Sequence, residues 1–81
     1  MLLDVTKVTV LPHYVLLLEF ENGEKRRFDM APYMDRNPFI RLKKQPLFHQ
    51  AFVDYGTVVW PDNIDIAPET LYDLSVPLDS S

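Results

Sequence analysis

The opening third of the chain alternates apolar and polar residues, a period-two pattern typical of β-strands. Residues 3–10 alternate in this way, but the apolar phase changes at Thr6 and Lys7. One extra residue in a β-bulge would produce such a change. After a turn at Pro12, residues 14–20 carry the strongest strand pattern of the sequence. These two runs predict the first strands of an antiparallel sheet.

The dipeptide Asn22-Gly23 predicts a hairpin turn into a third strand. A two-residue loop would place Glu21 opposite Glu24, whereas a three-residue loop with a left-handed glycine would pair Phe20 with Glu24. The second register gathers the apolar side chains on one face: Tyr14, Leu16, Leu18, Phe20, Phe28 and Met30. Their burial, at about 25 cal/mol per Å², outweighs any surface ion pair, worth at most about 1 kcal/mol. We therefore predict the three-residue loop.

The middle of the chain is predicted to be short and helical. Over residues 37–44, Asn37 is suited to cap a helix and a proline occupies the first helical position. Phe39 and Leu42 lie three residues apart and are expected to face inward. Two lysines fall in the last turn, where the helix dipole favours cations. Pro46 ends this helix and begins a further short turn.

Residues 51–60 predict a second hairpin whose loop consists of Asp54, Tyr55 and Gly56, again with glycine last. The cross-strand pairs implied by this loop are Val53 with Thr57, Phe52 with Val58 and Ala51 with Val59. A turn over residues 61–63 and an extended segment over residues 64–66 follow.

A final helix is predicted from Pro68 to Leu74, with Leu71 and Leu74 facing inward. The predicted fold is a single α+β domain over residues 1–75. It comprises a three-stranded antiparallel meander, a short helical segment, a second β-hairpin and the C-terminal helix, and residues 76–81 are expected to form a flexible tail.

Composition and charge narrow the possible functions. The chain has 81 residues, 47% of them hydrophobic, and no cysteine, which excludes disulfides, a thiol nucleophile and thiolate metal sites. The net charge of −4 is unevenly spread, because residues 25–44 contain seven lysines and arginines against two acids. Residues 45–81 contain six acids and no lysine or arginine. The acidic final third is therefore poorly suited to a polyanion, whereas the basic block suits phosphate or an acidic surface.

Few residues suggest catalysis. His13 and His49 have no ligand partner at helical spacing and are expected to be exposed turn and helix-edge residues. The two glycines are both used by hairpins, which excludes a phosphate-cradling loop. Asp62 and Asp65 lie close enough in sequence to suggest a divalent cation, but turn formation explains them without one. We expect no catalytic residue, no metal and no cofactor.

Aromatic and basic side chains are the candidates for contact with a partner. Trp60, Tyr55 and Tyr72 can anchor a protein interface if they are partly exposed, although Trp60 also suits the closure of a small core. Arg26 and Arg27 lie in the predicted third strand and can contribute charge complementarity.

Two segments of the chain resemble a known family. The first runs from Phe20 to Glu24 and continues in Arg27-Phe28-Asp29, and the second covers Phe48, residues 53–61 and residues 64–72. Together they resemble a bacterial family of small domains of unknown function. The resemblance implies an α+β fold without assigned catalytic residues. It also implies a genomic position beside a second small uncharacterised protein, in toxin–antitoxin-like pairs. Longer members carry a C-terminal helix-turn-helix, which has no counterpart in these 81 residues.

The sequence therefore predicts a cytoplasmic, non-enzymatic protein-interaction module, the acidic antitoxin-like member of a two-protein system. We expect a protein partner, with a homodimer as a further possibility, and neither a nucleic-acid nor a membrane partner. The alternative is a DNA-associated transcriptional regulatory domain that uses the basic block over residues 25–44.

Overall fold

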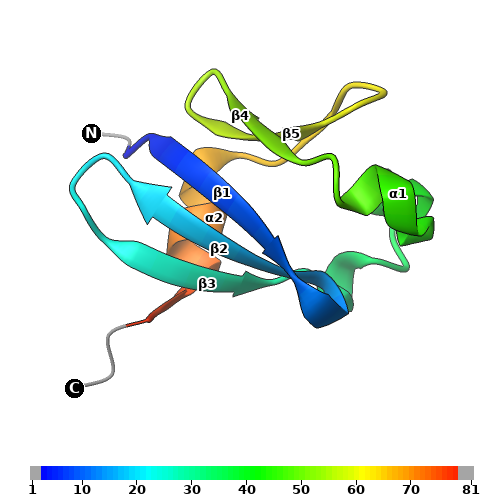
Figure 1. The fold of residues 1–81 in the computed structure, drawn as a ribbon, viewed down its shortest axis with the longest axis horizontal. Coiled ribbons are helices and arrows are strands. Elements are labelled where there is room, and N and C mark those ends of the chain that lie inside the picture. Colours follow the sequence, from blue (N-terminus) through cyan, green and yellow to red (C-terminus); the bar gives the residue numbers. More distant parts are fainter. Residues whose placement is uncertain (1–2, 79–81) are drawn as a thin grey trace.

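The structure, a computed structural model, describes residues 3–78 of the chain. It is an α+β fold built from strands and short helices (Figure 1). The strands are β1 (Val5–Leu11), β2 (Val15–Phe20), β3 (Lys25–Asp29), β4 (Phe52–Asp54), β5 (Thr57–Trp60), β6 (Ile64–Asp65) and β7 (Val76–Pro77). The α-helices are α1 (Gln45–Phe48) and α2 (Pro68–Leu74), and the 3₁₀ helices are η1 (Pro12–Tyr14), η2 (Ala31–Tyr33) and η3 (Phe39–Lys43).

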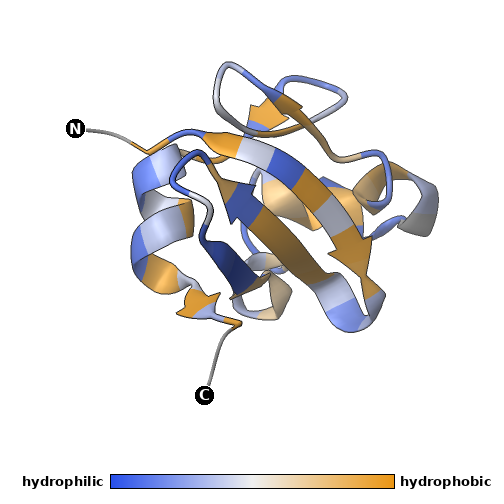
Figure 2. Ribbon diagram, turned by 60° about the vertical axis from the view of Figure 1, so that its left-hand side comes forward, coloured by the Kyte–Doolittle hydropathy of each residue, from blue (hydrophilic) through white to orange (hydrophobic). Residues whose placement is uncertain are grey.

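The first sheet has the strand order β1-β2-β3-β7 and is antiparallel throughout. Its central hairpin has the predicted register, with Leu16 opposite Phe28 and the Phe20 N–H donating to the Glu24 carbonyl at 2.9 Å. Gly23 has the predicted left-handed conformation, with φ of 88°. The predicted bulge is also confirmed, because the β1–β2 register shifts between Val5 and Lys7. Hydrophobic and hydrophilic residues alternate visibly along the ribbon of β1 (Figure 2).

The prediction of a loose tail from residue 76 was wrong for Val76 and Pro77. They form β7, which pairs with Arg27 and Arg26 of β3, and the Leu78 N–H donates to the Lys25 carbonyl at 3.0 Å. The pairing is possible because α2 returns the chain to the free edge of β3, whose backbone groups would otherwise face water. Residues 79–81 lie outside the described residues.

The second sheet has the order β4-β5-β6 and differs from the predicted hairpin in both size and register. Its pairs are Phe52 with Val59, Val53 with Val58, and Asp54 with Thr57. The predicted pairs were one residue out of step, because the loop contains only Tyr55 and Gly56. Both are left-handed, with φ of 53° and 73°, as a two-residue hairpin turn requires. The extended segment over residues 64–66 supplies β6, which was not predicted to join this sheet.

The short helix predicted over residues 37–44 is confirmed in its position, and it is the 3₁₀ helix η3. In η3, Leu42 is fully buried and Phe39 packs against the core, as predicted. Asn37 does not cap the helix, since Pro38 is the residue that precedes it and makes no side-chain capping hydrogen bond. The second short turn, through Phe48, is α1.

Helix α2 packs against the first sheet through Leu71, which is fully buried, and through Tyr72, whose ring meets Phe20 edge-on at 5.1 Å. The prediction that Leu74 also faces inward was wrong, since Leu74 is 56% exposed. It lies in the last turn of a seven-residue helix, where the chain already leaves for β7.

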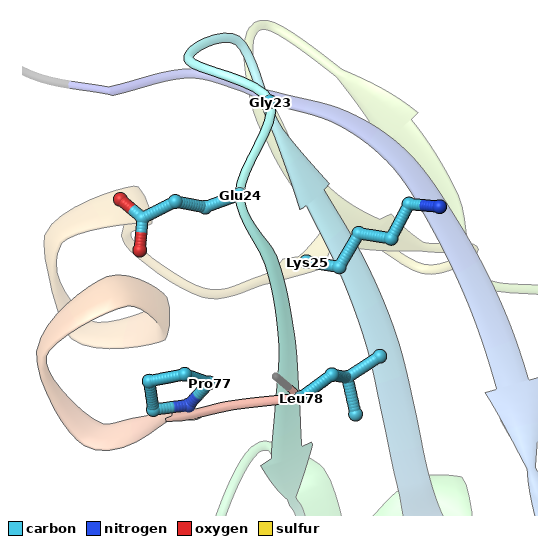
Figure 3. Close-up of a pocket in the computed structure, with 5 residues that line it drawn as sticks. All are labelled: Gly23, Glu24, Lys25, Pro77 and Leu78. Carbon is cyan, nitrogen blue, oxygen red and sulfur yellow. The ribbon is translucent and has the colours of Figure 1, made fainter. Parts of the chain in front are cut away.

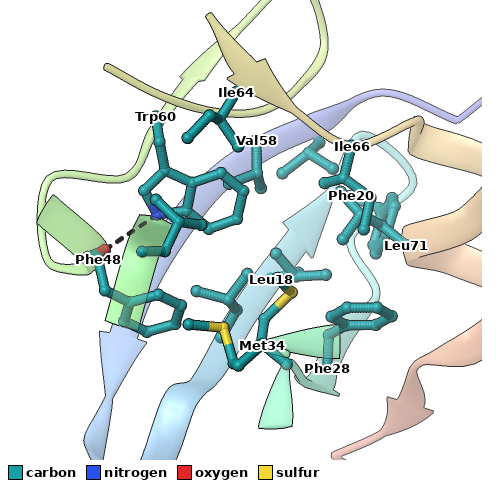
Figure 4. Close-up of a cluster of buried hydrophobic side chains, with 14 residues drawn as sticks. Leu18, Phe20, Phe28, Met34, Phe48, Val58, Trp60, Ile64, Ile66 and Leu71 are labelled. Carbon is teal, nitrogen blue, oxygen red and sulfur yellow. Dashed lines mark hydrogen bonds between the residues drawn. The ribbon is translucent and has the colours of Figure 1, made fainter. Parts of the chain in front are cut away.

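A single hydrophobic core joins the two sheets and the helices (Figure 4). The two sheets are also joined directly, because the Val5 N–H of β1 donates to the Gly56 carbonyl at 2.8 Å. The buried apolar residues are Val5, Leu16, Leu18, Phe20, Phe28, Met30, Met34, Leu42, Phe48, Val58, Trp60, Ile64, Ile66 and Leu71. Within residues 3–78, no helix has the length and apolar character needed to cross a membrane.

Candidate interaction surface

Arg26 is the centre of a polar network that holds the end of α2 against β3. Its Nε donates to Ser75 Oγ at 2.6 Å, and its two terminal nitrogens donate to Glu24 Oε1 at 2.9 Å and to the Ser75 carbonyl at 3.0 Å. The guanidinium also lies over the Tyr72 ring, 4.3 Å from its centre. Ser75 is buried and donates its hydroxyl hydrogen to the Tyr72 carbonyl at 2.9 Å. All three guanidinium nitrogens of Arg26 therefore donate to groups within the chain.

Glu24 and Tyr72 complete this network, and each shifts the pKa of the other. The Tyr72 hydroxyl donates to Glu24 Oε2 at 2.5 Å. This hydrogen bond, with others from Asn22 and Arg26, lowers the pKa of Glu24 below its ordinary value of 4.5. The same bond, which leaves the carboxylate beside the phenol, raises the pKa of Tyr72 above 10.0.

Two of the predicted contact residues, Arg26 and Tyr72, thus make contacts within the chain. They face each other and a shared carboxylate, and both are half-buried. Arg27 points to the other side of β3 and is exposed, beside a shallow hollow of about 340 Å³ that it lines with Val15 and Leu74. The sequence suggested Arg26 and Arg27 as one basic pair, but strand alternation separates them.

Trp60 is fully buried and is not a surface anchor. Its indole stacks near Phe48, with ring centres 5.9 Å apart, and its Nε1–H donates to the Phe48 carbonyl at 3.0 Å. Figure 4 shows this hydrogen bond inside the core. Of the two roles considered from the sequence, closure of the core is the one that the structure supports.

Tyr55 is the predicted contact residue that the structure leaves most available, with 93% of its surface exposed. It lies at the tip of the β4–β5 hairpin, beside the outer face of the second sheet. On that face, Phe52, Val59 and Asp65 form a row across the three strands, one residue from each. Phe52 is 44% exposed. The row gives the sheet an apolar centre open to solvent.

Carboxylates lie beside Phe52 and Val59, the two apolar residues of this row. Asp54 lies at the end of β4, and Asp62 lies in the turn before β6. Both, together with Asp65, line a shallow hollow of about 330 Å³ that also includes Phe52 and Tyr55. We call the surface formed by Phe52, Asp54, Tyr55, Val59, Asp62 and Asp65 the acidic sheet face. Among residues 3–78, the ion pairs are Lys7–Glu19, Arg26–Glu24 and Lys43–Asp35, so these three aspartates have no cationic partner within that range.

Within residues 3–78, Asp62 and Asp65 belong to no cluster of potential metal ligands. Within the described part of the chain, no group of three or more histidine, aspartate or glutamate residues is arranged to hold a metal ion. Asp62 occupies a left-handed turn position, with φ of 70°, which agrees with the turn-forming role considered from the sequence. His13 and His49 are exposed, as expected.

A larger hollow, of about 610 Å³, lies between the β2–β3 loop and the chain after β7 (Figure 3). Gly23, Glu24, Lys25, Pro77 and Leu78 line it. The Glu24 carboxylate and the Lys25 side chain point in opposite directions across it (Figure 3). Since Glu24 is bound to Arg26 and Tyr72, this hollow has no free converging charges among its lining residues.

The basic block over residues 25–44 is divided in the folded chain. Lys25 and its neighbours lie in β3, whereas the later cations lie around η3 at the α1 end of the molecule (Figure 1). These later cations are exposed. The same segment contains an apolar residue, Ile40, which is 43% exposed. We call the segment that carries the exposed residues Arg36, Ile40, Arg41, Lys43 and Lys44 the basic end. Lys43 is bound to Asp35 at 2.7 Å, which raises the pKa of Lys43 and lowers that of Asp35.

Sequence reasoning missed Phe52, Asp54 and Val59 as surface residues. The two-residue turn at Tyr55-Gly56 places Phe52 opposite Val59 on the outer face, and a tyrosine does not usually signal such a turn. A three-residue loop was predicted instead, and it paired Phe52 with Val58, which is fully buried.

The fold and its surface define a small α+β domain with two antiparallel sheets and an acidic, partly apolar outer face. The family model described as "Protein of unknown function (DUF2442)" matches residues 5–77, and the chain belongs to this family. The expected membership in a family of domains of unknown function is therefore confirmed. No curated protein and no solved structure matches the chain.

Proposed function

We propose that this domain is a non-enzymatic protein-interaction module, the acidic antitoxin-like member of a two-protein bacterial system. The observation that carries the proposal is the acidic sheet face, where the aromatic side chains of Tyr55 and Phe52 are exposed on a rigid hairpin. Exposed aromatic residues on a rigid scaffold are the usual anchors of protein interfaces, because they bury a large area and lose few rotamers on binding.

The position of Tyr55 supports a role at this face. Its backbone is left-handed, a conformation that costs a residue with a bulky side chain about 1–2 kcal/mol. The ring is almost fully exposed and so recovers little of that cost through burial within the chain. Asparagine or glycine would suit this turn position better. A tyrosine at this position is consistent with burial against another molecule.

The charge of the face indicates what kind of partner it would bind. Asp54, Asp62 and Asp65 lie beside the apolar centre, and no lysine or arginine follows residue 44. A partner that brings lysine or arginine side chains would neutralise these carboxylates, while its apolar side chains cover Phe52. Charge complementarity of this kind raises association rates and selects against acidic competitors.

The test is co-expression with the product of the neighbouring gene and capture through a tag on either protein. We expect the two proteins to co-purify at low salt. Tyr55→Asn should weaken the complex at least about tenfold, as loss of a central aromatic anchor does. The control is Leu74→Ser, which removes an exposed apolar side chain at the end of α2.

Two results would contradict the proposal. One is a failure of the two proteins to associate at low salt when both are folded. The other is a complex that Tyr55→Asn leaves intact while Leu74→Ser disrupts it, since this result would transfer the interface to the α2 end of the molecule.

A further inference from the structure

The molecule carries two surfaces of opposite charge and similar make-up. The acidic sheet face has three aspartates beside Phe52, which is 44% exposed. The basic end has exposed arginines and lysines close in sequence to Ile40, which is 43% exposed. Each surface thus pairs an exposed apolar side chain with charges of a single prevailing sign.

The two surfaces of one copy are held apart by the fold. Leu42 is fully buried and anchors η3 in the core, and η3 packs against α1. The acidic sheet face is likewise rigid, because Val58 and Trp60 fix the other side of β5 in the core. The basic end therefore cannot reach the acidic face of its own chain without unpacking core residues.

We propose that the acidic sheet face of one copy binds the basic end of a second copy, so that the chain self-associates head to tail. Ile40 of one copy would cover Phe52 of the other, and Arg41 and Lys44 would lie against the aspartates. Arg36, Arg41 and Lys44 take part in no ion pair among the described residues, so their charges remain available.

The association is weak and salt-dependent. Each surface consists of a few side chains, which corresponds to the small, transient class of interfaces below about 1,200 Å². Exposed charges interact over about 30 Å at 0.01 M salt but only about 3 Å at 1 M. Association should therefore require high protein concentration and low ionic strength.

This inference deepens the proposed function, because a partner at the acidic sheet face would compete with the second copy. It does not depend on finding that partner, since it is tested on the purified chain alone. Self-association without partner binding would contradict the proposed function only, and partner binding by a strictly monomeric chain would contradict this inference only.

The experiment is sedimentation velocity over a range of protein concentrations at 10 mM and 500 mM NaCl. We expect the weight-average sedimentation coefficient to rise with concentration at low salt and to stay at the monomer value at high salt. A chain that remains monomeric at low salt up to millimolar concentration would overturn the inference, as would association that is equal at both salts.

Charge reversal provides the decisive comparison. Arg41→Glu/Lys44→Glu reverses the basic end, and Asp54→Lys/Asp65→Lys reverses the acidic sheet face. Each variant alone should raise the apparent dissociation constant by more than about tenfold, because like charges then meet. An equimolar mixture of the two variants should associate again. The first variant keeps its acidic sheet face and the second keeps its basic end, so these two unchanged surfaces can still bind each other.

The control variant is Glu69→Lys/Asp73→Lys, which reverses two exposed charges on α2. It should associate as the wild type does. All exchanged residues are exposed, and the circular dichroism spectrum checks that each variant is folded. If the mixture stays monomeric, or if the α2 variant loses association equally, the head-to-tail arrangement is wrong.

Discussion

The guanidinium of Arg26 lies over the ring of Tyr72, and both side chains bind the carboxylate of Glu24. Arg26 also binds Ser75 through two nitrogens. This network joins β3 to the end of α2, 49 residues later in the chain. It holds the chain at the position from which β7 can pair with β3.

Arg26→Met should therefore lower the free energy of unfolding by about 1–3 kcal/mol, the usual loss when hydrogen bonds to a charged group are removed. The effect should also be local, with faster hydrogen exchange at the Leu78 amide, which is bound to the Lys25 carbonyl. Urea denaturation and amide exchange measure the two effects. The control is Arg27→Met on the exposed side of β3, and equal destabilisation by both changes would contradict the structural role of Arg26.

The pH dependence of stability should show the Glu24–Tyr72 hydrogen bond. The pKa of Glu24 is lowered in the folded chain, so its contribution is present above the ordinary value of 4.5 and is lost as the pH falls through the lowered value. The pKa of Tyr72 is raised, so its contribution is present below 10.0 and is lost as the pH rises through the raised value. In Tyr72→Phe, the free energy of unfolding should change less with pH in both windows. A variant with the same acid and alkaline slopes as the wild type would refute this assignment.

The two hairpin glycines should differ in their tolerance of alanine. Both are left-handed, which costs alanine about 1–2 kcal/mol. A Cβ at Gly23 would meet nothing within 4 Å, whereas one at Gly56 would lie 2.6 Å from the Asp4 carboxyl. Gly56→Ala should therefore destabilise the chain more than Gly23→Ala in urea denaturation. The excess should disappear in the Asp4→Ala background, and an excess that persists there would point to another cause.

Tyr55→Asn should stabilise the isolated domain by about 0.5–1 kcal/mol. Asparagine tolerates the left-handed conformation of this turn, and the exposed tyrosine ring leaves few contacts to lose. Thermal denaturation measures the change. Tyr55→Ala separates the two contributions, because it removes the ring but keeps the conformational cost, and it should leave stability nearly unchanged. A destabilised Tyr55→Asn variant would show that the ring packs within the chain.

Trp60→Phe should destabilise the domain by about 2–4 kcal/mol, from lost volume in the core and from a Phe48 carbonyl left without its donor. The loss should be seen in urea denaturation followed by circular dichroism, since the single tryptophan is removed. Phe52→Ser on the exposed face is the control and should cost less than about 1 kcal/mol. If the two changes cost the same, Trp60 is not the closure of the core.

Local patterns in the sequence were sufficient for the first hairpin. Period-two alternation and Asn22-Gly23 determine both the register and the buried face, because neighbouring strands joined by a short loop have few other ways to bury the same apolar residues. The bulge near Thr6 and the short helices of the middle followed in the same way. The type of turn at Tyr55-Gly56 was missed, since tyrosine is not a residue that usually signals a left-handed turn.

The sequence by itself determined the α+β class, the buried face of the first hairpin and the uneven distribution of charge. Only the tertiary structure decided which exposed residues share a surface. It buried Trp60, engaged Arg26 with Ser75 and paired Val76 with Arg27, because each of these contacts joins segments that are distant in sequence. It also brought Phe52 into one hollow with Asp54, Asp62 and Asp65. That grouping depends on the β4–β5 register, which differs by one residue from the predicted one, and on β6, which joins the sheet from beyond the hairpin. Local preferences carry no information about such contacts, because their free energy is gained only when the whole chain has packed.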